Sequence, residues 1–196
     1  MSHESRSLVV AVSLLALLST DSSAQLSPVP EGFGMGATVG YFTLNGSDFE
    51  GTQAGLGFEG YIREAMSSGF HVLYGVHYSV HKVDGVRNNL SVFSLFVDPR
   101  FAFSVGSPTP FIGARIAYVR QSISEDGTDY STPGFAVGGL GGLLFQLSPR
   151  VAIEATVLFG AVSLSATRVN GTLAPGTDTS GSTLAVQAGA VFSFPR

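Results

Sequence analysis

The sequence predicts an all-β fold: a closed eight-stranded antiparallel up-and-down transmembrane β-barrel. Three observations predict it. Beyond residue 24, large apolar residues alternate with small or polar ones, which is the period-two pattern of β-strands. Short connections alternate with more polar, mostly longer ones, as in outer-membrane barrels. Charged residues make up only 12% of the chain, about half of their usual share in a soluble domain.

The first 24 residues have the layout of a secretory signal peptide. Arg6 precedes an uncharged apolar run that ends at Leu18, and the small side chains of Ser22 and Ala24 fit a cleavage site before Gln25. The run is too short to span a bilayer, although an N-terminal membrane anchor is the alternative interpretation. Residues 25–32 then form a short leader, and the barrel domain is expected over residues 33–194.

Turn signals place the first four strands, and alternation is clearest in the third of them. There Phe70, Val72 and Tyr74 share one face, while His71 and every second residue after it share the other. In the fourth strand the alternation runs through a proline, Pro99, which a closed sheet tolerates poorly. We expect either a bulge at Pro99 or a strand that has already left the membrane there. The expected ranges are 34–45, 52–64, 69–82 and 88–104.

The last four strands alternate in the same way. Ile112 and Ile116 lie opposite Gly113 and Arg115 in the fifth, and similar patterns run over 151–161 and 184–194. A helix cannot present such a pattern as one stripe. The expected ranges are 110–123, 133–146, 151–167 and 181–194, with longer loops at 124–132 and 168–180.

The composition of the two faces predicts which one meets lipid. The chain has a single Lys, Lys82, and the face opposite the large apolar residues is rich in Gly, Ala, Ser and Thr. A soluble barrel would carry many Lys and Glu residues outside, whereas small side chains fit the crowded interior of an eight-stranded barrel. We therefore expect residues such as Tyr74 and Val186 to face lipid. Closure leaves no unpaired strand edges in the hydrocarbon.

Six charged residues fall on the expected inner face, three acids and three bases. Because buried ions must be paired, this neutral set predicts a closed or plugged lumen rather than an open channel. Surface charges on a soluble strand are the alternative. The six residues are Glu59, Arg63, Asp98, Arg100, Arg115 and Glu154.

Aromatic residues gather near the strand ends at the short turns, where a girdle at the membrane interface is expected. These residues are Tyr61, Phe70, Phe101, Phe103, Phe111, Phe145, Phe192 and Phe194.

His71, His77 and His81 share one strand and one face and are expected to line the lumen. His77 and His81 lie about 13 Å apart at ~3.3 Å per residue, too far to share a metal without ligands from other strands. No metal, cofactor or catalytic site is therefore expected. The acidic segment 124–129 is expected to be a solvated loop rather than a calcium site.

Lys82 and Arg120 lie on the outward face at the loop ends of their strands. They are candidates for contacts with lipopolysaccharide phosphates, or equally for ordinary interfacial anchors.

The chain resembles the small outer-membrane β-barrel family of the OmpA transmembrane-domain and OmpX type. The resemblance spans residues 32–194 and is carried by the segments 34–41, 110–115 and 188–194. It implies an outer-membrane location reached by export, and contact with outer-membrane lipid and lipopolysaccharide. In that family a terminal aromatic residue helps the barrel-assembly machinery to recognise the last strand. Here Pro195 and Arg196 follow Phe194.

These observations favour a non-enzymatic, porin-like or OmpA-like outer-membrane barrel with a structural or surface-interaction role. Its external loops would then serve as the interaction surface. One alternative is a soluble periplasmic lipocalin-like carrier. Another is a lipid-modifying enzyme, because His77-Tyr78-Ser79 is similar to the His-x-Ser segment of the lipid A deacylase PagL. A net charge of −4 gives no sign of a nucleic-acid partner.

Overall fold

A computed structural model describes residues 32–67, 69–103, 107–125, 127–174 and 178–195. The predicted signal peptide over 1–24 and the leader up to residue 31 lie outside the described residues. Among the described residues, no helix is long and apolar enough to cross a membrane.

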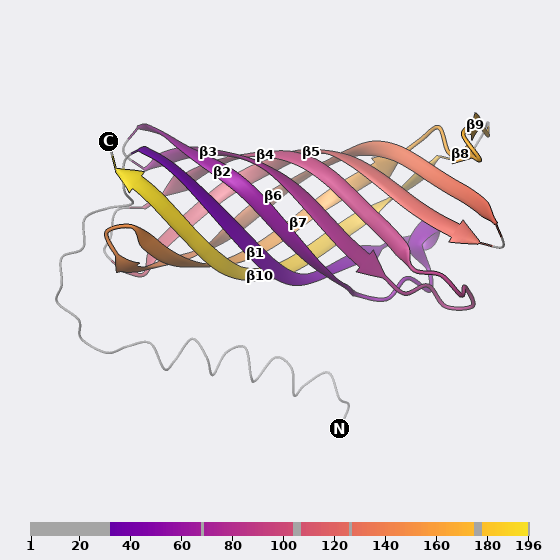
Figure 1. The fold of residues 1–196 in the computed structure, drawn as a ribbon, viewed down its shortest axis with the longest axis horizontal. Helices are drawn as coiled ribbons and strands as arrows, with labels where there is room; N and C mark the ends of the chain where they lie inside the picture. Colours follow the sequence, from indigo (N-terminus) through magenta and orange to yellow (C-terminus); the bar gives the residue numbers. More distant parts are fainter. Residues whose placement is uncertain (1–31, 68, 104–106, 126, 175–177, 196) are drawn as a thin grey trace, which may run out of the picture.

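Eight antiparallel strands form a closed barrel, and the predicted fold class is confirmed (Figure 1). Each barrel strand pairs with the next one along the chain, and β1 pairs with β10 to close the ring. The alternating residues explain this closure. Every strand has an inner and an outer face, and closing the sheet into a barrel gathers all the inner faces in one covered lumen. The strands are β1 (Gly32–Asn45), β2 (Gly55–Ser67), β3 (Phe70–His81), β4 (Leu90–Ala102), β5 (Thr109–Glu125), β6 (Thr128–Ser148), β7 (Val151–Leu164) and β10 (Thr179–Pro195).

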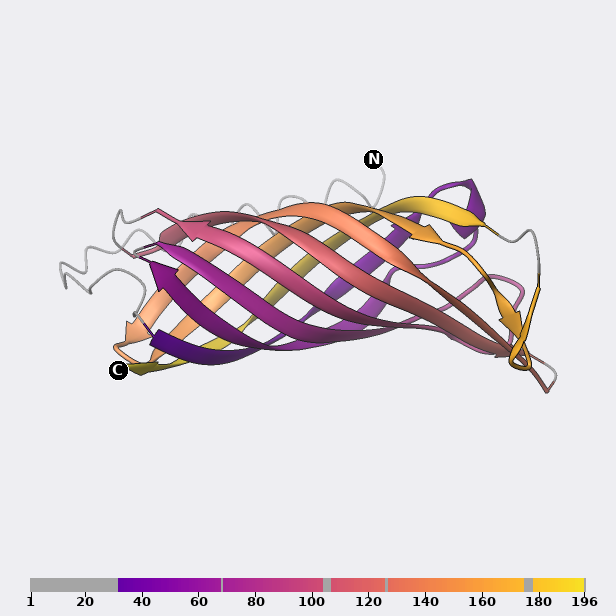
Figure 2. The same cartoon turned by 90° about the horizontal axis from the view of Figure 1, so that it is seen from above.

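Three short elements lie at one end of the barrel, opposite the end where β10 finishes (Figure 2). They are the 3-10 turn η1 (Ser47–Phe49) and the strands β8 (Arg168–Val169) and β9 (Thr172–Leu173). β8 pairs with both β9 and β6. This end, which carries the longer connections, is called the loop end below, and the other is called the short-turn end.

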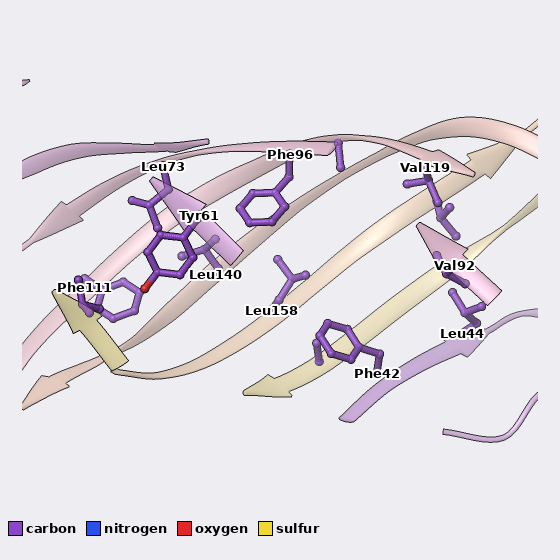
Figure 3. Packing of buried hydrophobic residues seen from close by; sticks show 14 of the residues in the cluster. Phe42, Leu44, Tyr61, Leu73, Val92, Phe96, Phe111, Val119, Leu140 and Leu158 are labelled. Carbon is purple, nitrogen blue, oxygen red and sulfur yellow. The ribbon is translucent and has the colours of Figure 1, made fainter. Parts of the chain in front are cut away.

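Burial alternates along the strands as the sequence pattern predicts. In β7, Val157 and Phe159 are exposed on the outside, whereas Glu154 and Leu158 are buried inside. The interior holds more large side chains than expected, because Phe42, Phe96, Phe111 and other aromatic or aliphatic residues point into it (Figure 3). The lumen is thus lined by both apolar and ionic groups.

Two residues assigned to the aromatic girdle belong to the interior. Tyr61 is 5% exposed and Phe111 is 2% exposed. The reason is strand parity, since Tyr61 lies two residues from both Glu59 and Arg63, and Phe111 lies two residues from Gly113. Phe145 is half-buried. The other five predicted girdle residues, Phe70, Phe101, Phe103, Phe192 and Phe194, are exposed.

The predicted loop over 124–132 is wrong. β5 and β6 continue as a ladder to the pair Glu125–Thr128, so that only residues 126 and 127 separate them. Gly127 has a φ of +79°, and an Asp-Gly pair is a strong signal for such a two-residue turn. The predicted 168–180 loop contains the small β8–β9 hairpin, and its residues 175–177 lie outside the described part.

Pro99 is accommodated without a bulge. The β4–β5 ladder pairs Val97 with Ile116 and Arg100 with Gly113, and the register is unchanged between them. Only the two intervening positions, Asp98 and Pro99, are missing from the ladder. On its other side, Pro99 stays in register with β3. The proline therefore interrupts one ladder locally.

Candidate functional site

The charged residues of the inner face form a network in the lumen. All six predicted residues are buried, with exposed fractions of 7% or less. The structure brings five of them together in ion pairs. They come from β2, β4, β5 and β7, so the network connects strands that are distant in the sheet.

Arg115 is the centre of this network. Its Nε donates to Asp98 Oδ1 at 2.8 Å, and one Nη donates to Asp98 Oδ2 at 2.7 Å. The same guanidinium also donates to both carboxylate oxygens of Glu59, which lies on β2. Its planar fork thus binds two carboxylates, an arrangement that a lysine could not reproduce. The guanidinium also lies over the ring of Phe96, with its Cζ 3.8 Å from the ring centroid.

Arg100 extends the network toward the short-turn end. It donates to Asp98 Oδ2 at 3.1 Å and to Glu154 Oε1 at 3.0 Å. Glu154 also accepts hydrogen bonds from the Tyr61 hydroxyl at 3.1 Å and the Thr156 hydroxyl at 3.0 Å. The carboxylate is therefore held by three different side chains.

Arg63 differs from the other five residues. Its guanidinium donates to the hydroxyl of Ser193 at 2.6 Å. Within the described residues it has no carboxylate at ion-pair distance.

The three predicted histidines are all buried in the lumen, and two of them form a hydrogen-bonded chain. His77 Nε2 lies 3.0 Å from Ser79 Oγ, and His81 Nε2 lies 2.9 Å from the same oxygen. His81 Nδ1 lies 3.1 Å from the carbonyl oxygen of Gln53. His77 Nδ1 faces Glu59 at 3.5 Å, so the chain begins at the ionic network and runs toward the loop end.

For a neutral His81, the partners of this chain set where its protons lie. A carbonyl only accepts, so a neutral His81 carries its hydrogen on Nδ1, and its Nε2 accepts from Ser79. Ser79 has one hydrogen, which this bond uses. Its oxygen must therefore accept from an N–H at Nε2 of His77.

A cavity of about 60 Å³ adjoins these residues. His77, Ser79, His81, Ser94, Arg115 and Thr183 supply its polar lining, and the remaining lining is apolar. One water molecule needs about 10–15 Å³ on this measure, so the space suits a few small polar occupants rather than a lipid chain.

Ser79, His77 and Glu59 lie in the order of a nucleophile, a base and an orienting carboxylate. However, Ser79 is 1% exposed on the inner face, and its hydroxyl already bonds to two histidines. An acyl chain in the surrounding lipid would lie on the other side of the barrel wall. The geometry therefore favours a structural hydrogen-bonded chain over catalysis on lipid.

Lys82 and Arg120 are both exposed but are not brought together. The strand registers place Arg120 level with Phe93 and Tyr78, and Tyr78 precedes Lys82 by four residues. Arg120 donates from Nε to Ser131 on β6 at 2.7 Å.

Hydrogen bonds fasten the connections between strands at the loop end. These connections, together with the adjoining strand ends, are called the rim below. Asp48 accepts from the Ser180 amide at 2.9 Å, and Gln53 donates to Asp84 at 2.8 Å. Asn88 donates to the carbonyl of Ser124. On the far side, Asn170 exchanges hydrogen bonds with the backbone of Asp129. The β1–β2, β3–β4 and β7–β10 connections are thus each fastened to a neighbouring connection or strand end.

Sequence reasoning did not identify several members of the network. The girdle prediction for Tyr61 is wrong, because its parity with Glu59 and Arg63 places it in the lumen. Gln187 accepts from Thr38 at 2.7 Å and donates to Glu59 at 3.3 Å. Alternation alone puts Thr38 and Gln187 inside, but nothing in the sequence indicates that they meet. Among the described residues, no group of three or more His, Cys, Asp or Glu could hold a metal ion.

Comparison with solved structures places the chain among outer-membrane barrels at the level of the fold. Neisserial surface protein A (NspA) matches with a TM-score of 0.65 and 20% identity, covering 84% of this chain and 98% of NspA. OprG from Pseudomonas aeruginosa matches at a TM-score of 0.49 and 12% identity, covering 86% of this chain and 99% of OprG. Ail, the attachment invasion locus protein of Yersinia pestis, matches at 0.43 and 16%, covering 83% and 99%.

No protein-family model matches the sequence, and no curated protein matches it. The match to NspA shows that the chain has the fold of the small outer-membrane β-barrels, as its resemblance to them predicts.

Proposed function

We propose that this protein is a non-enzymatic outer-membrane barrel whose lumen is closed and whose loop-end rim is an interaction surface. The observation that carries the proposal is the outer wall. Large apolar side chains are exposed all around the barrel, among them Val39 at 62%, Ile116 at 60%, Phe159 at 63% and Val186 at 56%. A soluble protein rarely exposes so much contiguous apolar surface. The hydrocarbon of a bilayer requires such a wall.

The ionic network supports a closed lumen. Arg115, Arg100 and their carboxylate partners bridge strands on different sides of the interior, and Phe42, Phe96 and Phe111 occupy much of the remaining space. An ion crossing this barrel would have to displace paired charges, which is costly. We therefore expect no steady conductance in planar bilayers. A stable open channel that Glu154→Ala abolishes would contradict this part of the proposal.

The rim supports the interaction role. Three of its connections are hydrogen-bonded to one another or to neighbouring strand ends, so binding a partner there would require little further ordering. Lys82 and Arg120 are placed below the rim on the outer wall, where lipopolysaccharide phosphates would be their partners. Delivery to the membrane would use the export signal and the barrel-assembly machinery.

Fractionation tests the location. We expect carbonate or urea washing to leave the protein in the membrane fraction, and unboiled samples to migrate differently from boiled ones on a gel. A soluble lipocalin-like carrier would be released by the wash. Comparison of lipid A profiles between wild type and Ser79→Ala tests the enzymatic alternative, and we expect identical profiles.

Cysteine labelling tests the orientation, because the chain has no cysteine of its own. Arg87 is exposed at the loop end and Arg150 in a short turn at the opposite end. We expect a membrane-impermeant maleimide to label Arg87→Cys in intact cells, and Arg150→Cys only after the outer membrane is opened. The reverse pattern would place the rim in the periplasm and exclude an external interaction surface.

A further inference from the structure

The hydrogen-bonded chain of His77, Ser79 and His81 ends on an acceptor at both sides. Toward the loop end, His81 Nδ1 lies 3.1 Å from the carbonyl oxygen of Gln53. At the other end, His77 Nδ1 lies 3.5 Å from Oε1 of Glu59, a carboxylate that is ion-paired within the network. Neither a carbonyl nor a carboxylate supplies a hydrogen. The two rings and the serine hydroxyl must therefore supply the hydrogens of all four contacts along the chain.

The neutral side chains supply one hydrogen too few. Each neutral imidazole carries one N–H and the serine carries one O–H, which leaves one of the four contacts empty. With a neutral His81, the empty contact is at Nδ1 of His77, a buried atom that has no hydrogen-bond partner among the described residues. Reversing every hydrogen would serve Glu59 but leave Nδ1 of His81 bare against the Gln53 carbonyl. In either arrangement, a bare ring nitrogen faces an acceptor.

The surroundings of His77 are suited to a cation. Glu59 is in place to be the counter-charge that a buried cation needs. The ring of Phe42 lies with its centroid 4.2 Å from that of His77, close enough for a cation–π interaction. Arg115 opposes a further positive charge, but it is already paired with two carboxylates. Apart from His81, the other residues that line this cavity, which come from β1, β3, β4, β5, β6, β7 and β10, are uncharged.

The same count limits the chain to one added proton. Two charged rings would put an N–H on each side of Ser79, whose own hydrogen would then have no acceptor in the chain. The second cation would also lack a counter-charge, because His81 faces a neutral carbonyl. Asp84, at the rim, binds the side chain of Gln53 instead. Uptake of a single proton is therefore the state in which every contact of the chain is filled.

We propose that the chain of His77, Ser79 and His81 is a binding site for one proton, taken up from solution as the medium becomes acidic. An N–H bond forms at Nδ1 of His77, no bond breaks, and the ring carries the charge opposite Glu59. The chain then runs without a gap from Gln53, which is exposed at the rim, to the ionic network. The connection between rim and network thus responds to pH. This inference goes beyond the proposed function and does not depend on what the rim binds.

Nitrogen NMR on the folded barrel in detergent, with ¹⁵N-labelled histidine, tests the site. The ¹⁵N shifts distinguish a bare ring nitrogen, a neutral N–H and a charged ring, and single His→Gln variants assign the signals. Between about pH 8 and about pH 5, the range in which histidines ordinarily titrate, we expect His77 to become charged while His81 stays neutral with its hydrogen on Nδ1. His71 is the matched control on the same strand and face. Neither of its ring nitrogens has a hydrogen-bond partner among the described residues, and we expect it to stay neutral.

Ser79→Ala separates this explanation from a simple attraction between His77 and Glu59. Without the hydroxyl, each neutral ring can place its one hydrogen on Nδ1 and fill the two remaining contacts, so that no proton is missing. We expect proton binding at His77 to weaken roughly tenfold or more, as loss of a hydrogen bond to a charged group predicts. The midpoint of its titration then moves about one pH unit lower. Ser94→Ala is the matched control, since Ser94 is buried in the lining of the same cavity but lies outside the chain, and it should titrate as wild type.

The proposal is overturned if His77 stays neutral at about pH 5, which would mean that water in the cavity supplies the missing hydrogen. Simultaneous charging of His77 and His81, or an unchanged titration in Ser79→Ala, would also contradict it. The wild-type spectra decide the first two outcomes without any substitution, so the test stands even where Ser79→Ala fails to fold. None of these outcomes changes the fractionation or labelling results that test the proposed function.

Discussion

At the scale of single residues, Arg115 illustrates how the lumen is stabilised. Its guanidinium satisfies two carboxylates from two other strands, Glu59 and Asp98, and none of the three groups is more than 7% exposed. Each partner therefore depends on the others for compensation of its charge. Strand parity predicts that these residues face inward, but not which carboxylates Arg115 binds.

Replacing Arg115 by methionine should lower the free energy of unfolding by about 3–5 kcal/mol, because two buried carboxylates lose their cation. Arg120→Met is the matched control, since Arg120 lies on the same strand but is exposed, and it should cost no more than ~0.5 kcal/mol. Urea unfolding followed by circular dichroism measures both, as the chain has no tryptophan. Equal losses in the two variants would mean that the buried network contributes no more than a surface charge.

At the scale of elements, β6 shows why the inner face needs small residues. Gly142 faces inward, and a Cβ there would collide with the carbonyl oxygen of Ala155 and the ring of Phe111. Gly139, three residues earlier, is exposed, and a Cβ there would meet nothing closer than the carbonyl oxygen of Gly113 at 4.0 Å. The inner glycine thus allows the neighbouring strand and a large aromatic residue to approach closely.

We expect Gly142→Ala to destabilise the barrel by about 1–3 kcal/mol, the usual cost of overpacking, and Gly139→Ala to be neutral or slightly stabilising. The same urea measurement compares them on one strand. A tolerated Gly142→Ala would show that β6 can shift away from β7 and that the close approach is not required.

At the scale of the whole molecule, the outer wall is the feature that separates a membrane barrel from a soluble one. Val157 lies in the middle of β7, is 49% exposed and pairs with Val186 of β10. Ser163 lies on the same outer face near the loop end and is also exposed. If the wall faces lipid, these two positions lie at different depths in the bilayer.

An arginine at these two positions should have unequal effects. Val157→Arg should destabilise the protein by about 2–4 kcal/mol in lipid vesicles, because the charge lies near the bilayer midplane, whereas Ser163→Arg should cost about 0–1 kcal/mol. In a soluble barrel, both arginines would face water and neither substitution would cost much. Equilibrium unfolding from vesicles distinguishes the two cases.

The sequence alone determined the fold class, the approximate ranges of the eight strands and the face of most inward residues. It could do so because alternation and turn signals are local, and each is read from a few neighbouring positions. The tertiary structure decided which inner residues meet. Arg100 of β4 reaches Glu154 of β7, Arg115 of β5 reaches Glu59 of β2, and Arg63 is left with Ser193. These contacts cross the lumen between strands distant in the chain, so they depend on the stagger and tilt with which the barrel closes, and no local pattern records either.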